Sequence, residues 1–529
     1  MSRAPRRFQG VELELARQLF GSVVEGMGRV LMRAAFSPNI KERRDYSCAL
    51  FDADGRAVAM GDHMPVHLGS MPAAVQSVLG TLPPRAGEMV AVNDPFSGGT
   101  HLPDLTLVTA YPASTAARPR FYVANRAHHS DIGGAHAASM APGPEEIFAE
   151  GLVIPPVRLV RDGNLDPDLM ALILGNVRTP REREADLRAQ IAANLEGFRR
   201  LEEVERRVGR KRLSEWAGAQ IDYAGRIIRK FLKEIPDGSY PASEFLEGAH
   251  RGDRLIRLQV KVRVRGGRVE VDFSGTDPQV PGNLNAVEAI TRSATYFVFR
   301  CLVREAIPFN AGCFDAIQVR IPPGTVLSAR RPAAVAGGNV ETSQRVVDLV
   351  LKALRSALPD RIPAQSCGTM TNLTLGGRDP RTGAAFTYYE TIAGGMGASS
   401  AGSGQSAVHT SMTNSLNTPV EALEQAYPLR VLTYALRRGS GGDGKHRGGD
   451  GVVREIQALS SSEASLLTDR YLRSPAGARG GRPARSGCSW IVGRGHAKSL
   501  GSKVRLKLHP GESLRIATPG GGGWGKKQR

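Results

Sequence analysis

The chain has 529 residues, of which 41% are hydrophobic and 23% are charged. This composition is typical of a folded protein of roughly two to four domains or of one large fold with several subdomains, and it excludes a disordered, fibrous or coiled-coil protein. The formal charge is +19 at pH 7, but the arginines lack the interleaved aromatic residues of a nucleic-acid groove. We therefore interpret the charge as solvated surface, and a basic, non-catalytic nucleic-acid-binding protein is kept only as an outside alternative.

The cysteines and the N-terminal residues indicate in which cellular compartment the protein is expected. Five cysteines, an odd number at wide spacings without a Cys-x-x-Cys pair, predict free thiols in a reducing environment, so a cytoplasmic location is expected. Arg3, Arg6 and Arg7 are followed by Glu12 and Glu14 rather than by the apolar core of a signal peptide. No segment is apolar enough to span a bilayer, so a membrane is not expected as a partner. A nucleic acid is not expected either, for the reason given above.

Apolar spacing predicts both helices and strands. Residues 11–36 have the pattern of an amphipathic helix, and residues 45–60 predict a β-hairpin with an Asp-Gly turn. Residues 255–273 alternate apolar and charged side chains around a Gly-Gly turn, which predicts a half-exposed hairpin. The expected fold class is mixed α/β (α+β), with helical N-terminal elements and a β-rich C-terminal third. We divide the chain into an N-terminal α/β region, a central hairpin and α/β region, and a Gly-rich β region, at 1–235, 236–365 and 366–529.

A long helix is predicted to begin at Thr179-Pro180, where Thr179 can cap the helix and Pro180 suits its first position. Apolar residues then recur every three or four positions to Val208. A polar stripe runs beside the apolar one and consists of Asp186, Gln190 and Asn194. Composition favours a solvated shoulder for this stripe, and the alternative is a polar wall beside a functional site.

Histidine is concentrated between residues 61 and 160, which hold six of the eleven histidines. His101 and Asp104 lie close together on a loop, and His128 and His129 follow a predicted strand. Imidazole and carboxylate ligands together suit a divalent transition metal such as Zn, Mn or Fe. The sequence therefore predicts a metal site, with hydrogen-bonded loop histidines as an equally weighted alternative from spacing alone.

Only one of the two adjacent histidines can easily join His101, because neighbouring strand residues point to opposite faces. The other is expected to orient a ligand or bind substrate. Asp45 is a further carboxylate candidate, and the pair His63 and His67 could lie near the site or satisfy a turn.

Two segments nearly match the nucleotide-binding pattern G-x-x-x-x-G-K-[ST], but neither is accepted as a nucleotide site. They end in His446 and Lys527, where the pattern needs a hydroxyl group for magnesium, and neither opens a helix. No nucleophilic serine or cysteine motif stands out. ATP binding and covalent catalysis are therefore not expected of this chain alone.

Long motifs accompany the His101/Asp104 and His128–Asp131 segments. They are KERRDYS (41–47), GDHMPVH (61–67), VDFSGTDPQVPGNLNA (271–286), GGNVETSQR (337–345), HTSMTNSLNTPVEALEQAYPLR (409–430) and TPGGGGWG (518–525). Through these motifs the chain resembles the hydantoinase B/oxoprolinase family from about residue 10 to residue 525. The family contains the B subunits of ATP-dependent N-methylhydantoinases, the matching half of 5-oxoprolinase, and related ketone carboxylase subunits.

The resemblance implies a division of labour between two chains. A separate A subunit with an actin-like ATPase fold uses ATP and Mg to phosphorylate the carbonyl oxygen of a small cyclic amide, and the B subunit hydrolyses the activated substrate. Family members hold a metal in the B subunit, and His101, Asp104 and His128 match that motif, with His129 as the alternative ligand. The implied protein is one half of a hetero-oligomeric cyclic amide hydrolase, and a ketone carboxylase subunit is the alternative.

A metal in this site is expected to bring the pKa of a bound water down toward neutrality. Asp45 and Asp131 are the candidates to orient or deprotonate that water, and His129 completes the expected catalytic set. The hydroxide would attack the phosphorylated carbon and open the cyclic amide with loss of phosphate.

Two glycine-rich segments, at 394–397 and 520–523, permit positive φ and close backbone approach. Their successive N–H groups could form an anion-binding nest for the phosphorylated intermediate, and flexible loops are the alternative. A nest predicts that Gly522→Val lowers turnover while leaving folding intact.

Overall fold

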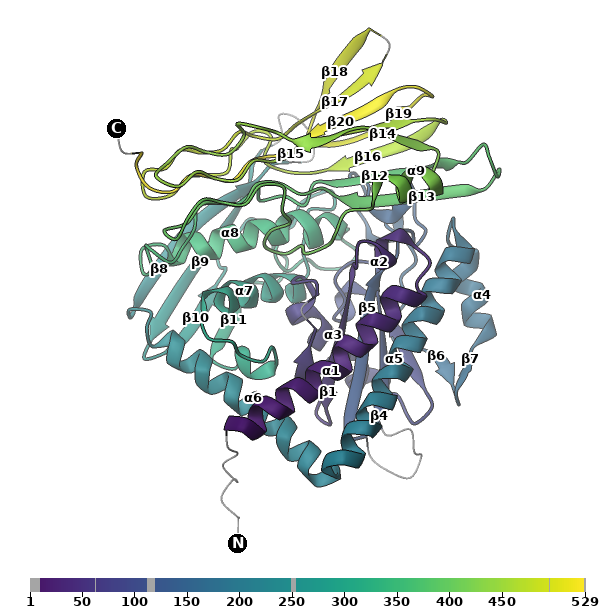
Figure 1. Ribbon diagram of the computed structural model, residues 1–529, viewed down its shortest axis with the longest axis vertical. Coiled ribbons are helices and arrows are strands. Elements are labelled where there is room, and N and C mark those ends of the chain that lie inside the picture. Colours follow the sequence, from purple (N-terminus) through teal and green to yellow (C-terminus); the bar gives the residue numbers. More distant parts are fainter. Residues whose placement is uncertain (1–9, 62, 112–118, 249–253, 494, 528–529) are drawn as a thin grey trace.

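The structure, a computed structural model, describes residues 10–61, 63–111, 119–248, 254–493 and 495–527. Within these ranges helices combine with four β-sheets, which confirms the mixed α/β class (Figure 1). The three arginines near the start, on which the signal-peptide interpretation depended, lie outside the described residues. None of the described helices combines the length and apolar character needed to cross a membrane.

A seven-stranded sheet forms the N-terminal part, with the strand order β2-β1-β5-β4-β3-β6-β7 and antiparallel pairing between neighbours. The hairpin expected from residues 45–60 is present as its first two strands. The strands of this sheet are β1 (Tyr46–Asp52), β2 (Ala57–Met60), β3 (Met89–Val92), β4 (Asp104–Tyr111), β5 (Phe121–His128), β6 (Val157–Arg161) and β7 (Asn164–Leu165).

Helices cover both faces of this sheet because each face is apolar. α1 and α5 lie side by side against β1, β4 and β5, where residues such as Phe20, Leu201 and Val123 form one buried cluster (Figure 1). α3 packs on the opposite face of the sheet and also against the helix Glu288–Leu302, so it joins the first sheet to the central region. The helices of this part are α1 (Gly10–Ala34), α2 (Pro38–Lys41), α3 (His67–Thr81), α4 (Pro167–Gly175), α5 (Pro180–Val208) and α6 (Arg210–Leu232).

The central region is a four-stranded sheet of order β11-β10-β9-β8 covered by α7 and α8. Burial alternates residue by residue along β9, which confirms the half-exposed hairpin expected at 255–273. The elements are β8 (Gly238–Leu246), β9 (Ile256–Arg265), β10 (Arg268–Asp272), α7 (Glu288–Leu302), β11 (Ile317–Arg320) and α8 (Ser343–Leu354). Short 3-10 turns lie at Pro95–Ser97, Ala137–Ser139, Ile147–Ala149 and Ala311–Cys313, and a π-helical turn lies at Gly338–Thr342.

Two further sheets, of orders β13-β12-β16-β19 and β14-β15-β20-β17-β18, make up the C-terminal third at the top of Figure 1. Their inner faces share one apolar cluster with α9. The elements are β12 (Asn372–Arg378), β13 (Ala385–Thr391), α9 (Val420–Ala426), β14 (Leu429–Leu436), β15 (Val452–Ala458), β16 (Ser462–Leu467), β17 (Cys488–Gly493), β18 (His496–Leu500), β19 (Lys503–Leu508) and β20 (Ser513–Ala517). Each sheet draws its strands from one of the three ranges given above, and the domain division itself stays a prediction.

The glycine-rich segments are neither an anion nest nor flexible loops, so both interpretations are wrong. Segments 394–398, 440–450, 476–482 and 519–524 lie against one another and are linked by backbone hydrogen bonds, and we call them the glycine bundle. Gly521 N donates to Gly449 O and Gly522 N donates to Gln365 O, so these N–H groups cannot bind an anion. Residues 520–523 have no positive φ; they are glycine because a Cβ would overlap a neighbouring backbone.

This packing also overturns the expectation for Gly522→Val. A side chain at position 522 would meet the carbonyl group of Ala476, so the substitution is expected to disturb folding rather than turnover alone.

Candidate metal centre

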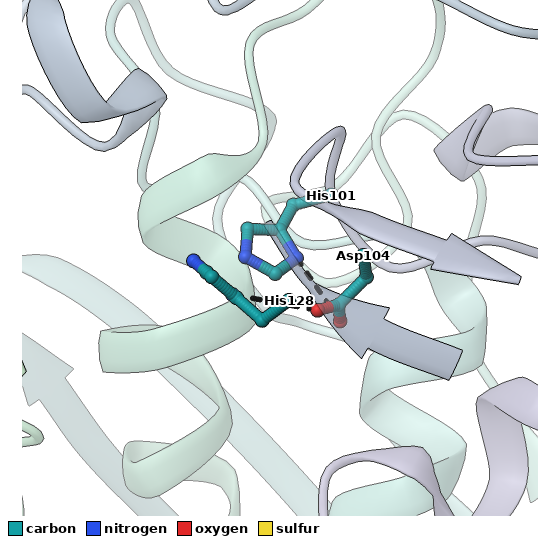
Figure 2. Close-up of side chains that lie close together, drawn as sticks. All are labelled: His101, Asp104 and His128. Carbon is teal, nitrogen blue, oxygen red and sulfur yellow. Dashed lines mark ion pairs between the residues drawn. The ribbon is translucent and has the colours of Figure 1, made fainter. Parts of the chain in front are cut away.

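The expected metal ligands meet where two neighbouring strands of the first sheet end. β4 begins at Asp104 and β5 ends at His128, and the two residues are direct partners in the antiparallel register. His101 lies in the turn before β4, and its carbonyl oxygen accepts a hydrogen bond from Asp104 N at 3.1 Å. One ligand atom from each of the three residues lies within 4.8 Å of the others, and Figure 2 shows the side chains converging. Strand pairing therefore assembles this set, which we call the His/Asp cluster.

All three side chains of the His/Asp cluster are buried. Asp104 Oδ2 lies 3.2 Å from His101 Nδ1, and Asp104 Oδ1 lies 3.4 Å from His128 Nδ1. Burial by itself raises the pKa of Asp104, but the neighbouring His101 and His67 hold that pKa well below its usual value. Burial lowers the pKa of His128. An ionised carboxylate beside a neutral imidazole is the combination that binds a metal.

This donor set fits a divalent transition metal. Asp104 Oδ1, which faces His128 Nδ1, is buried without a hydrogen-bond partner in the described part of the chain. Leaving a buried polar atom unsatisfied costs about 1–3 kcal/mol, which a bound cation would offset. Two imidazoles and a carboxylate are ligands suited to Zn, Mn or Fe.

Neighbouring side chains hold Asp104 in place. Thr100 Oγ1 donates to Asp104 Oδ2 at 2.5 Å, and His67 Nε2 lies 3.1 Å from the same oxygen. The other ring nitrogen of His67 lies 2.8 Å from Ser47 Oγ. His67 therefore lies at the site and orients the carboxylate, as the partners of metal ligands commonly do.

Asp45 lies at the edge of the His/Asp cluster. Its Oδ2 atom is 3.9 Å from His128 Nδ1, and Asn39 Nδ2 lies 3.5 Å from that same oxygen. Asn39 is fixed in turn by the fully buried Arg43, which donates to Asn39 Oδ1 and to Tyr389 O. Among the three expected catalytic residues, only Asp45 makes an ion pair with a cluster residue in the described part of the chain.

His129 and Asp131 make their contacts elsewhere. His129 Nε2 lies 2.9 Å from Gln190 Oε1 on α5, while Asp131 Oδ1 accepts a hydrogen bond from Arg178 Nη1 at 2.9 Å. Asp131 also accepts backbone hydrogen bonds from Gly133, Ala138 and Arg178. These contacts favour positioning roles for both residues, and their catalytic assignment stays a prediction.

The polar stripe of α5 is buried, so its interpretation as a solvated shoulder is wrong. Asp186, Gln190 and Asn194 are each 0% exposed. Gln190 Nε2 donates to Leu105 O at 2.9 Å and Asn194 Nδ2 donates to Thr109 Oγ1 at 2.9 Å. The stripe is a polar wall that packs behind the strands carrying the cluster.

Two residues beside the histidines come from distant parts of the chain and were missed by the sequence analysis. Tyr389 of β13 stacks on His128 with ring centroids 4.6 Å apart and an interplanar angle of 11°. Asn339 Nδ2 lies 3.4 Å from His101 Nε2, and it belongs to the π-helical turn before α8. Such turns are frequent at functional sites, so the GGNVETSQR motif was the signal that could have identified Asn339.

His63, the other histidine of its pair, packs against Tyr46 on the side facing α1, with ring centroids 4.9 Å apart. Burial, followed by the charges of His67 and Arg44, lowers its pKa from 6.5 to about 4. As the pH falls, His63 therefore becomes protonated near pH 6.5 in the unfolded chain but only near pH 4 in the folded chain. The free energy of unfolding is expected to fall as the pH is lowered from 6.5 to 4, by at most about 3 kcal/mol from His63. Above pH 7 this histidine should have no effect on stability.

Urea unfolding of His63→Gln beside the unchanged protein between pH 4 and 8 measures this contribution. The difference in unfolding free energy should change between pH 6.5 and 4 and be constant above pH 7. A constant difference over the whole range would show that His63 titrates alike in both states.

Comparisons with known proteins agree with this arrangement of the fold. The Hydantoinase B/oxoprolinase family model matches residues 9–527. 5-Oxoprolinase 1 of Arabidopsis thaliana is 37% identical over 97% of this chain, and the chain spans 42% of that protein's length. Caprolactamase subunit beta of Pseudomonas jessenii is 29% identical over 98% of this chain and 91% of its own length.

Solved structures show the same fold. A crystal structure of ATP-dependent caprolactamase from Pseudomonas jessenii matches 98% of this chain and 92% of its own chain with a TM-score of 0.91 at 27% identity. A nucleotide-free acetone carboxylase structure matches 98% of this chain and 76% of its own with a TM-score of 0.89, but at 19% identity this likeness concerns the fold alone. The match along nearly the whole sequence, together with the shared fold, shows that the chain belongs to the hydantoinase B/oxoprolinase family.

Proposed function

We propose that this chain is the hydrolytic subunit of an ATP-dependent cyclic amide hydrolase and that it acts on a substrate phosphorylated by an ATP-binding partner. The observation that carries the proposal is the buried His/Asp cluster in a member of this family. The names of two relatives, 5-oxoprolinase and caprolactamase subunit beta, support a cyclic amide as substrate. The second name also supports a partner chain, which we expect to be a hydantoinase A-like subunit in a hetero-oligomer.

His101, Asp104 and His128 would hold the divalent cation. When bound, such an ion supplies Lewis acidity and lowers the pKa of a coordinated water. His67 and Thr100 keep the Asp104 carboxylate oriented, and stacking against the Tyr389 ring fixes the orientation of the His128 ring. The cluster therefore offers ligands whose positions are set before substrate arrives.

Asp45 is the residue we propose to accept a proton from water, because its carboxylate lies beside the His/Asp cluster. Addition of one water to the phosphorylated carbon and cleavage of the C–N bond leave an acyl phosphate and a free amine. A second water converts the acyl phosphate to carboxylate and phosphate. His129 and Asp131 contribute by fixing the segment that follows β5, through Gln190 and Arg178.

The experiment is a reconstitution of the two subunits. This chain alone, the ATP-binding partner alone and the two together are incubated with 5-oxoproline or caprolactam, with and without ATP, and the free amine and phosphate are measured. Ring opening is expected only with both chains and ATP, with one phosphate released for each ring opened. Full turnover by this chain alone would contradict the proposal, and bicarbonate-dependent consumption of a ketone would favour the carboxylase alternative.

A further inference from the structure

A pocket of about 470 Å³ lies beside the start of β1 and does not include the His/Asp cluster. Arg29 of α1, Arg44 and Tyr46 around the start of β1, His63 after β2 and Asn414 contribute to its lining. Arg29, Arg44 and Asn414 are exposed, so the pocket opens to solvent. Its volume falls in the range of about 300–1,000 Å³ that is typical of small-molecule sites.

The inner wall of this pocket is built around His63. A Cβ at Gly28 would lie 3.1 Å from His63 Nε2, and a Cβ at Gly61 would overlap the same ring. Glycine at these two positions therefore leaves the space that the imidazole fills against Tyr46. His63 Nδ1 is buried and has no hydrogen-bond partner among the described residues, so a polar side chain in the wall retains unused hydrogen-bonding capacity.

The two arginines of this pocket have no ion-pair partner among the described residues. The guanidinium groups of Arg29 and Arg44 form no ion pair or hydrogen bond with any described residue. Glu25 is the acidic residue of the lining, so the two arginines leave a net positive charge while His63 is neutral. Arg44 also has a φ of 55°, a backbone conformation that non-glycine residues rarely adopt.

We propose that this pocket is an anion site that binds a small molecule bearing a carboxylate or a phosphate group. Two guanidinium groups supply charge and paired N–H donors, and Asn414, whose Nδ2 donates to His63 O at 3.0 Å, lies at the rim. The imidazole of His63 and the phenol ring of Tyr46 form the inner wall. Because these rings close the pocket on that side, it suits a small organic anion rather than a macromolecule. Phosphate and carboxylate can each accept two parallel N–H hydrogen bonds from one guanidinium group through a pair of oxygen atoms.

The anion site is separate from the His/Asp cluster although the two are close in sequence. Arg44 and Tyr46 line the pocket, whereas Asp45 between them faces His128. The segment 44–46 therefore forms a partition with the anion site on one side and the cluster on the other. The proposal does not depend on the hydrolase activity proposed above, because anion binding is measured without turnover.

Isothermal titration calorimetry of the full chain with inorganic phosphate, 5-oxoproline and 2-pyrrolidinone tests the site. The last compound is the 5-oxoproline ring without its carboxylate. Saturable binding of phosphate, or of 5-oxoproline but not 2-pyrrolidinone, is expected and identifies the group recognised. Arg29→Gln and Arg44→Asn should each weaken this binding about 10-fold or more, because each removes a charged hydrogen-bond donor. Asparagine is chosen at position 44 because it tolerates the left-handed backbone.

Two further variants act as controls. Arg33→Gln removes an exposed arginine of α1 that does not line the pocket, and it should leave binding unchanged. Glu25→Gln removes the opposing carboxylate and should tighten binding up to about fivefold. Absence of saturable binding by phosphate and by 5-oxoproline would overturn the proposal, as would equal binding by the unchanged protein and both arginine variants. Should Arg44→Asn fail to fold, Arg29→Gln on the exposed face of α1 decides alone.

Discussion

Replacing His101 by alanine is expected to abolish stoichiometric metal binding and to lower the ATP-dependent ring-opening rate of the reconstituted enzyme by more than about 100-fold. The histidine is fully buried and its Nδ1 atom lies 3.2 Å from Asp104, so alanine removes one of the three side chains of the cluster. Loss of a residue that merely supports a ligand already costs about 10–100-fold in metal affinity or activity, and loss of a ligand should cost more.

Metal content per chain, measured by inductively coupled plasma mass spectrometry after dialysis, and the rate of amine release are the readouts. His67→Asn should give an intermediate result, because it removes the support of Asp104 without removing a ligand. His509→Ala removes an exposed histidine and should change neither readout. If His101→Ala retained both its metal and its activity, His101 would have no place in the site.

The second large effect is expected in the glycine bundle. Gly521→Ala should lower the free energy of unfolding by at least about 3 kcal/mol, because the new methyl group would overlap the backbone of Met396. Backbone hydrogen bonds hold this segment in place, since Gly521 N donates to Gly449 O and its neighbour Gly522 N donates to Gln365 O. Both hydrogen bonds would have to lengthen to admit one methyl group.

Gly402→Ala is the matched control for this substitution. Gly402 lies in the same third of the chain, has no positive φ, and would place its Cβ in open space. Urea denaturation followed by circular dichroism should therefore separate the two alanine variants clearly. Equal stability of the two proteins would mean that the close backbone packing around position 521 is not required.

Local patterns identified the parts of the site that strand geometry assembles. The sequence pointed to His101, Asp104 and one of the histidines 128 and 129 through their local density and the family motif, and alternation along a strand allowed only one of the adjacent histidines to join the others. In the structure His128 faces Asp104 and His129 faces Gln190. The amphipathic helices and the two hairpins followed from the same short-range periodicity.

Contacts between distant segments could not be predicted in this way. Tyr389 lies 261 residues after His128 along the chain, and Asn339 reaches His101 from the central region, although only Asn339 stands in a motif that could have marked it. The polar stripe of α5 was misinterpreted because composition cannot show that Gln190 will find strand carbonyl groups to satisfy it. The glycine-rich segments were misinterpreted because glycine permits both positive φ and close packing, and only the positions of neighbouring backbones decide between them.

The glycine bundle has a consequence for the order of events during synthesis. Its first and last segments, 394–398 and 519–524, are separated by more than a hundred residues, and 519–524 contacts backbone groups of Gln365, Gly449 and Arg482. The N-terminal sheet with α1 and α5 can assemble while translation continues, since domains fold as units from the N-terminal side. The bundle cannot close until residues 519–524 have been made, so partly synthesised chains carry unpaired backbone groups in 394–398 and 440–450. Ribosome-bound chains that stop before residue 519 should therefore be protease-sensitive in these two segments even when their N-terminal sheet is already protected.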